Sequence, residues 1–192
     1  MEELRRERSD LELLSPEEEQ VLFDDAQRSA LEESGGNIWA AGNVRIGDYI
    51  LLIDSDTRVP PDCFIDAASE LERSPDVGAL QHCSGITYVH NHYFERLLGY
   101  FVGVFTNFSL SWVCSNGAMA PLMGHNVFLR WKALQECSRP HKDGSQIIFS
   151  PNHVSEDYEM GMRLQMAGYW IRWATYSNQE FKGELATISK DF

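Results

Sequence analysis

The sequence predicts an α/β domain whose mostly parallel sheet is flanked by helices. Beyond residue 37, short apolar runs of strand length alternate with longer runs whose apolar residues recur at helical spacing. Residues 49–53 are apolar at every position, which is typical of a strand buried on both faces, and we expect this strand to be central. Asp54 and Asp56 follow it directly, at the strand end where such sheets bind their ligands.

An acidic segment precedes this domain. Residues 1–34 hold 12 Asp or Glu against four Arg, so they account for most of the formal net charge of −13. A cap residue, a proline and two acids at residues 15–18 start a helix, and the glycines at residues 35–36 end the segment, which predicts two surface helices. Because these helices lack a wide apolar stripe, we expect residues 1–36 to be a peripheral helical insertion and residues 37–192 to form the domain.

The first half of the domain is expected to contain a second strand and two helices. Residues 60–73 predict a helix, and residues 77–83 predict the strand that follows. The inner side of this helix is expected to hold Phe64, Ala67, Ala68 and Leu71. Residues 97–113 predict a helix with a broad aromatic face. Since four polar residues interrupt this stretch, and a spanning helix needs about 20 apolar residues, we expect a buried or interfacial helix and not a membrane span.

The second half continues the alternation. Residues 126–129 predict a short strand, residues 130–137 a short helix, and residues 138–152, with their prolines and glycine, a loop. A further helix is expected to start at residues 155–157, and residues 169–175 predict the last strand. Within that helix Met160, Leu164 and Ala167 are expected to face inward, with Gly168 just past its end.

The overall charge and the cysteines exclude some classes of function. A formal net charge of −13 argues against a nucleic-acid partner, because binding phosphates requires clustered Lys and Arg. The four cysteines form no Cys-x-x-Cys pair and have no histidine at zinc-finger spacing, so reduced structural thiols are expected, as in the cytosol. The sequence does not begin with a positively charged stretch followed by an apolar run, so no signal peptide is expected.

Asp54 and Asp56 are candidate metal ligands. Two carboxylates past a strand can turn toward one point, and hard oxygen ligands suit Mg²⁺ or Mn²⁺ bound together with substrate phosphates. A solvated turn is the simpler interpretation of the pair taken alone. A calcium loop is excluded because Val59 and Ile65 stand where it needs Gly and Glu. A haloacid dehalogenase-type phosphatase fits poorly because Arg58 stands at the fifth position.

Glu156 and Asp157 form a second acidic pair, at the expected start of a helix. The helix dipole and free backbone N–H groups favour carboxylates there, so this position alone does not indicate catalysis. Combined with a metal–diphosphate centre, such an acid can take a proton from an attacking hydroxyl. Between the two pairs, His125 could be a metal ligand, a donor to a phosphate or a hydrogen-bonded loop residue.

Three segments in this order, ILLIDSDTRVP, MGHNVFLRWKAL and SEDYEMGMRLQMAGY, resemble family 2 glycosyltransferases of the processive cellulose, chitin and hyaluronan synthase type, with features of a fungal branch. The resemblance covers about residues 39–177, including Gly42 and Asn43 as a Gly-Asn element. It implies a partial GT-A (Rossmann-like) fold. It also implies a nucleotide-sugar donor, notably a UDP-sugar, and a glycan or other hydroxyl acceptor.

The resemblance further implies a role for each motif residue. Asp54 would lie near the nucleotide and metal, Asp56 would bind Mg²⁺ or Mn²⁺ directly, and Asp157 would be the catalytic base, supported by Glu156. Gly124, His125 and Asn126 match a Gly-x-Asn element that lines the donor and acceptor pocket, although that family usually has Thr where His125 stands. We expect Asp54, Asp56 and Asp157 to face one crevice.

Some parts expected from the resemblance do not appear. The family's first βαβ unit with its uracil-binding Asp, its Gln-x-x-Arg-Trp element and its membrane helices are not found, which predicts a catalytic core cut at both ends. Gln165 with Arg172 and Trp173 has the wrong spacing for that element. In the full-length protein, flanking helices would anchor the domain on the cytosolic side of a membrane. The alternative is a non-catalytic remnant that acts as a binding or regulatory partner.

Overall fold

A computed structural model describes residues 16–39, 47–90, 92–141, 146–150, 154–178 and 180–184 of the chain. The chain divides into two compact units, Met1–Arg45 and Ile46–Phe192. The expected domain boundary at residue 36 stays a prediction, because the residues just before strand β1 lie outside the described part. The Gly-Asn element at Gly42 and Asn43 lies outside it as well.

The first unit contains helix α2, Pro16–Glu33. It begins at the proline that the sequence pattern places in the first turn, where the missing N–H costs no hydrogen bond. It ends before Gly35 and Gly36, whose φ angles of 58° and 86° are left-handed. None of its described side chains is buried. The helix expected before it falls among residues 1–15, outside the described part.

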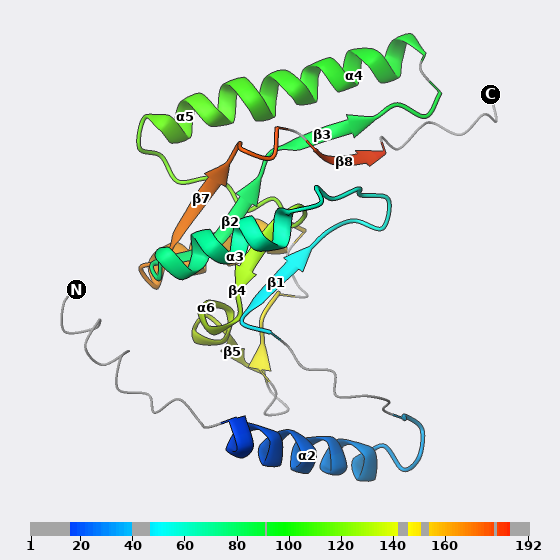
Figure 1. Ribbon diagram of the computed structural model, residues 1–192, viewed down its shortest axis with the longest axis vertical. Coiled ribbons are helices and arrows are strands. Elements are labelled where there is room, and N and C mark those ends of the chain that lie inside the picture. Colours follow the sequence, from blue (N-terminus) through cyan, green and yellow to red (C-terminus); the bar gives the residue numbers. More distant parts are fainter. Residues whose placement is uncertain are drawn as a thin grey trace. The chain divides into compact units, whose positions relative to one another are not determined.

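The second unit is built on a four-stranded sheet with the order β1-β4-β2-β7. Its strands are β1 Tyr49–Leu52, β2 Val77–His82, β4 Val127–Arg130 and β7 Trp170–Ala174. Strand β4 is antiparallel to β1 and β2, while β7 is parallel to β2. Hence β1, β2 and β7 all run in one direction (Figure 1). The expected α/β fold is confirmed, although the sheet is mixed, because two of its three strand pairs are antiparallel.

Strand β1 lies at the edge of this sheet, so the expectation of a central strand buried on both faces is wrong. Its four residues are only partly buried, and β4 is its one partner strand in the described part of the chain. An apolar run shows that a segment is strand-like and packed, but the run does not show how many neighbours the strand has. The central pair of strands is instead β4 and β2, in which only Arg130 is not fully buried.

Helices cover both faces of the sheet. Helix α3, Cys63–Arg73, packs on one face through Cys63, Ala67 and Leu71. Helices α6, Trp131–Glu136, and α7, Glu156–Met166, pack on the other. The core below α6 and α7 includes Leu129, Leu134, Met160, Leu164 and Ile171.

Three helix details differ from expectation. Helix α3 starts at Cys63, later than expected, and the Phe64 side chain is 59% exposed, although its ring meets Phe128 edge-on. The buried stripe runs through Cys63, Ala67 and Leu71, and Phe64, one residue on from Cys63, is turned about 100° away from it. Ala167 is exposed because α7 ends at Met166, before the position expected to face inward. Gly168, with a φ of 88°, lies just past that helix as predicted.

Two small sheets were not predicted. Strands β3, Ser84–Thr87, and β8, Phe181–Glu184, form a parallel pair. Strands β5, Arg139–Pro140, and β6, Gln146–Ile147, form an antiparallel pair within the segment expected to be a loop. Because β8 joins β3 across about a hundred residues of sequence, no local pattern indicates the pairing.

One long helix runs along β3 (Figure 1). It consists of α4, Tyr93–Gly103, a π-helical stretch η1, Val104–Leu110, and α5, Ser111–Ser115. Its aromatic side chains are exposed, so the buried alternative is wrong. At 23 residues it is longer than the apolar run suggested, and in the described part of the chain it alone is long and apolar enough to cross a membrane.

All four cysteines are free, as predicted for reduced thiols. Cys63, Cys83 and Cys137 are buried, and Cys114 is half-buried. Burial raises the pKa of the Cys63 and Cys114 thiols, which keeps them protonated and unreactive near neutral pH.

Candidate active site

The register of the sheet brings the Asp54–Asp56 turn and the Gly124–Asn126 loop to the same end of the strands. Leu52, the last residue of β1, pairs with Val127, the first residue of β4. Asp54 follows the first of these residues by two positions, and Asn126 precedes the second by one. Because β4 runs against β1, the acidic turn and the loop before β4 both emerge at the carboxyl ends of β1 and β2.

The loop before β4 is held in place by Gln81, a fully buried residue of β2. The Gln81 amide donates to the His125 carbonyl at 2.8 Å and accepts from the Met123 N–H at 2.9 Å. The His82 N–H donates to the Asn126 carbonyl at 2.9 Å. These bonds fix the loop backbone against the sheet, so its geometry does not depend on solvent.

The loop backbone is left-handed at two positions, a conformation that glycine adopts freely and asparagine only at some cost. Gly124 has a φ of 75° and Asn126 a φ of 52°, both in the left-handed region. Asn126 is not a glycine, and its amide is anchored by donating to the Ser84 hydroxyl at 2.9 Å. Such backbone conformations persist only where surrounding contacts enforce them, and they occur often at ligand sites.

Gly124 brings the loop against Asp157. A Cβ atom at Gly124 would lie 3.1 Å from both the Cβ and Oδ2 atoms of Asp157. The absence of a side chain therefore allows the backbone to approach the carboxylate, and the φ angle independently favours glycine. Two motifs that are 33 positions apart in the sequence are thus in contact.

Asp157 lies in the first turn of α7 and is half-buried. Its Oδ1 atom accepts from the Tyr158 N–H at 2.7 Å, whereas Oδ2 faces Gly124. Glu156, the predicted supporting acid, is exposed. The third acid of this turn, Glu159, pairs with Arg139 and Arg163 at 2.9 Å each and so stabilises the fold. Only Asp157 combines a fixed position with contact to the loop.

Two polar atoms of the loop lack partners. The His125 Nδ1 and Asn126 Oδ1 atoms are buried and make no hydrogen bond in the described part of the chain. A buried polar atom without a partner costs about 1–3 kcal/mol, so native structures rarely keep one without a reason. His125 directly follows Gly124, the residue that contacts Asp157, and Asn126 follows His125.

Asp54 and Asp56 lie on an exposed turn after β1. The Thr57 N–H donates to the Asp54 carbonyl at 3.0 Å, which closes the turn. Asp56 lies beside β8, because its Oδ1 atom is 3.7 Å from the position of a Cβ on Gly183. No group of three His, Cys, Asp or Glu side chains among the described residues could hold a metal alone. Two carboxylates nonetheless fit Mg²⁺, which takes one or two of them together with phosphates and waters.

His82 is a buried histidine beside this region that the sequence did not single out. Its ring packs against Phe128, Tyr176 and Phe181, and Nδ1 lies 3.4 Å from the Ser177 hydroxyl. Burial lowers its pKa to about 4, so the side chain is neutral at physiological pH.

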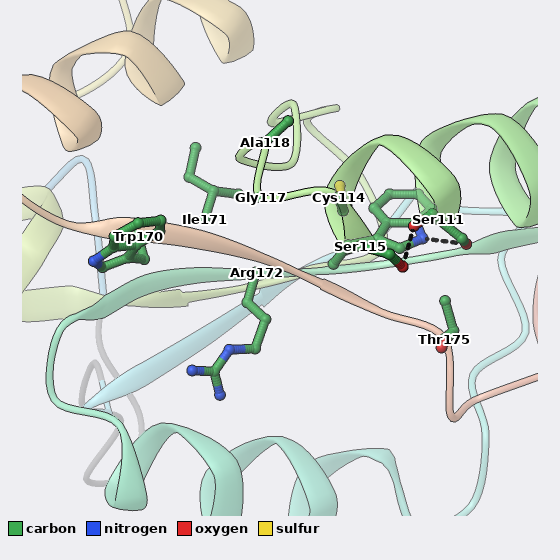
Figure 2. A pocket seen from close by; sticks show the side chains of 10 residues that line it. Ser111, Cys114, Ser115, Gly117, Ala118, Trp170, Ile171, Arg172 and Thr175 are labelled. Atoms are coloured by element: carbon green, nitrogen blue, oxygen red, sulfur yellow. Dashed lines mark hydrogen bonds between the residues drawn. The ribbon is translucent and has the colours of Figure 1, made fainter.

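A cavity of about 380 Å³ lies elsewhere, at the outer edge of β7 (Figure 2). Its walls come from α5, the loop after it and β7, and include Cys114, Gly117, Trp170 and Trp173. The Trp173 indole N–H donates to the Ser111 hydroxyl at 3.0 Å, which joins the helix to the strand. None of the predicted site residues lines this cavity, so its size does not identify it with the motif chemistry.

Sequence analysis missed Gln81 and Ser84. Gln81 is a polar residue that follows the apolar residues Val77–Leu80 in a strand whose six residues are all buried. A polar side chain in such a strand indicates a buried hydrogen-bonding role. Ser84 gave no such indication, since its contact with Asn126 spans 42 positions.

In α/β folds, ligands bind at the carboxyl ends of the parallel strands, which is where the carboxylates and the Gly124 loop of this sheet lie. The sequence model of the family described as glycosyl transferase family group 2 matches residues 49–189. The chain therefore belongs to this family, and its fold is a partial GT-A fold. No curated protein matches the chain.

Proposed function

We propose that this chain catalyses an inverting glycosyl transfer in which Asp157 is the general base. Membership of the family establishes glycosyl transfer in general terms, with a nucleotide-sugar donor and an acceptor. The observation behind the finer proposal is the contact between Asp157 and Gly124, beside the unpartnered His125 Nδ1 and Asn126 Oδ1 atoms. In this proposal one hydroxyl of the bound sugar would donate to Asn126 Oδ1, and a different hydroxyl, the attacking one, would lie near the carboxylate.

In the proposed step, the Asp157 carboxylate takes the proton of the acceptor hydroxyl. The hydroxyl oxygen attacks the anomeric carbon and forms the new glycosidic bond. The bond from that carbon to the donor phosphate breaks on the opposite side, so the configuration inverts and the nucleoside diphosphate leaves with the bonding electrons. The Tyr158 N–H fixes Oδ1, which leaves Oδ2, on the loop side, to accept the proton.

Asp54 and Asp56 are the residues that would hold a divalent cation. Mg²⁺ or Mn²⁺ bound there would neutralise charge on the departing diphosphate. The exposed turn gives both carboxylates access to a donor, and the pairing of Leu52 with Val127 puts this turn at the same sheet edge as the loop. Convergence of Asp54, Asp56 and Asp157 on one crevice stays a prediction.

Further features of the proposal come from the resemblance to polysaccharide synthases. They are a UDP-sugar donor, a glycan acceptor, a place in a fungal branch of the family, and a full-length protein held at a membrane with this domain in the cytosol. These features guide the choice of uridine diphosphate as the probe below.

The proposed roles of Asp157 and Asp56 differ in whether their loss affects donor binding or only turnover, and this difference can be tested. We expect Asp157→Asn to lower transfer by about a hundredfold or more, because a general base acts on the acceptor proton only in the transition state. Its metal-dependent binding of uridine diphosphate should persist. Asp56→Ala should weaken that binding as well as transfer, since a metal ligand also acts before the reaction. Calorimetric titration with Mn²⁺ and a transfer assay on the full-length protein measure both.

Asp48→Asn is the matched control. Asp48 is an exposed carboxylate at the opposite end of β1, so its loss should change neither quantity. Normal turnover in Asp157→Asn would remove the proposed base and the mechanism built on it.

A second candidate function is a non-catalytic binding or regulatory partner. The edge position of β1 favours it: among the described strands β1 pairs with β4 alone, and an edge strand can pair with a strand of another chain. This function predicts binding to a full-length transferase and no turnover in any variant.

A further inference from the structure

We propose that the helix formed by α4, η1 and α5 binds a lipid bilayer while lying in the plane of its surface. The surface concerned, here called the aromatic face, consists of the exposed side chains Tyr93, Phe94, Leu97, Tyr100, Phe101, Phe105, Phe108 and Trp112. This inference extends the membrane association proposed above to residues of this chain. It does not depend on the transfer chemistry.

The aromatic face exposes a large apolar surface to solvent, which is unfavourable unless something binds it. Tyr93 is 81% exposed and Phe108 is 70% exposed, and the face runs the whole length of the 23-residue helix. Soluble proteins seldom expose so long an apolar strip unless it binds something. Its Tyr and Trp side chains lie near the two ends and the middle, and these amphipathic rings favour the headgroup region of a bilayer.

Charge selects a lipid surface as the partner. The chain has 29 acidic residues, yet between Asp76 and Glu136 the sequence contains one, Glu95. The Glu95 side chain is 1% exposed and accepts from the backbone N–H of Val89 at 2.8 Å. The aromatic face therefore presents no carboxylate, while Arg96 is exposed beside it. An acidic protein approaching an anionic membrane would meet least repulsion along this helix.

Several polar side chains of the helix hydrogen-bond to carbonyls within it. Thr106 donates to the Val102 carbonyl at 2.9 Å, Asn107 to the Gly103 carbonyl at 3.2 Å and Ser115 to the Ser111 carbonyl at 2.6 Å. Polar groups that already have partners can enter a medium of low polarity at much lower cost than groups that must leave water. The Ser111 hydroxyl donates to the Thr106 carbonyl at 3.3 Å, so three of the four polar residues that interrupt the apolar run have partners that lower the cost of burial in lipid.

Packing of the opposite side keeps the helix in the plane of the surface. Gly99 lies against the Tyr88 ring, Thr106 donates to the Ser84 carbonyl at 3.3 Å, and Ser111 binds Trp173. A spanning orientation would have to break these contacts with β3 and β7. Only the aromatic face is available, so insertion reaches the boundary between headgroups and acyl chains.

Vesicle flotation tests the proposal on the full 192-residue chain without any nucleotide sugar. We expect it to float with phosphatidylcholine vesicles, and no more strongly when phosphatidylserine is included, because the chain carries a formal net charge of −13. The double substitution Phe101→Glu with Phe108→Glu should lower the partition coefficient by about a hundredfold or more, since two large apolar side chains are lost to the bilayer. Ile65→Glu, the same kind of change on the exposed side of α3, is the matched control and should bind normally.

Quenching by brominated lipid gives a second measurement that needs no charged variant. Bromines near the headgroup should quench part of the tryptophan emission of the wild-type chain, and Trp112→Phe should remove that part. Stronger quenching by bromines at the acyl ends would place Trp112 near the bilayer centre, deeper than a helix at the headgroup boundary allows, and would overturn the in-plane orientation.

Three flotation outcomes would also overturn the proposal. The first is that the wild-type chain binds neither kind of vesicle. The second is that Ile65→Glu lowers vesicle binding as much as the double substitution does. The third is that the chain binds no vesicle and is a dimer in solution, which the double substitution converts to a monomer. The last outcome would assign the aromatic face to a second copy of the chain. In each case the transferase proposal, which is tested by donor binding and turnover, would remain.

Discussion

Gly124 is the single residue on which the candidate site depends most directly for its shape. It combines a left-handed φ of 75° with a close approach to the Asp157 carboxylate. A side chain there would both strain the backbone and push the proposed base away from the loop. The same residue therefore sets the distance between the unpartnered loop atoms and the proton acceptor.

We expect Gly124→Ala to destabilise the fold by about 1–2 kcal/mol from the φ angle alone, with a further loss from the clash with Asp157. Gly168→Ala is the matched control, because Gly168 has a φ of 88° and nothing lies within 4 Å of its added Cβ. Urea denaturation of both variants separates the two contributions. Equal destabilisation, with transfer retained in both, would show that the contact with Asp157 is unimportant.

His82 predicts a pH dependence of stability. Its pKa is about 4 in the folded chain against 6.5 as a model value, so the unfolded chain binds the proton more tightly. Stability is therefore full above about pH 6.5 and falls as the pH drops toward 4, by about 3 kcal/mol at most. Thermal unfolding of the wild type and His82→Gln across this window measures the effect. An unchanged slope in the variant would assign the pH dependence to other groups.

Motif residues could be found from the sequence because their chemistry needs particular residue types. Asp54, Asp56 and Asp157 are carboxylates at a strand end or a helix start, and Gly124 sits among polar residues before a strand. Gln81 and Ser84 could not be placed in the same way. Their roles come from hydrogen bonds to residues more than 40 positions away, and a local pattern contains no information about such partners.

At the scale of elements, the sequence predicted the type of most helices and strands but not their neighbours. The strands β2, β4 and β7 appear close to their expected positions, since apolar periodicity reports burial directly. The edge position of β1 and the β3–β8 pair depend on which strands meet, and this is decided by contacts across the whole chain. The aromatic face of the long helix was predicted, but whether it is buried or interfacial stayed open, because apolar residues alone do not say what covers them.

At the scale of the whole chain, the distribution of charge and the extent of the family match both follow the division into two compact units. The family match begins at residue 49, inside the unit Ile46–Phe192, while most of the net charge belongs to the unit Met1–Arg45. The candidate site lies wholly within the second unit. The first unit therefore contributes acidity but none of the residues to which we assign chemistry.

This division predicts unequal protection of backbone amides. The described side chains of α2 are not buried, so opening this helix should require little free energy, whereas β2 has six buried residues between β4 and β7 and should open only when the unit unfolds. We expect amides of Pro16–Glu33 to exchange about a thousandfold faster or more than those of Val77–His82. Hydrogen–deuterium exchange followed by mass spectrometry measures both segments in one sample, and α7 is an internal control that should resemble β2. Protection of α2 as strong as that of β2 would show that the acidic segment unfolds together with the sheet, and the interpretation of a peripheral insertion would then be wrong.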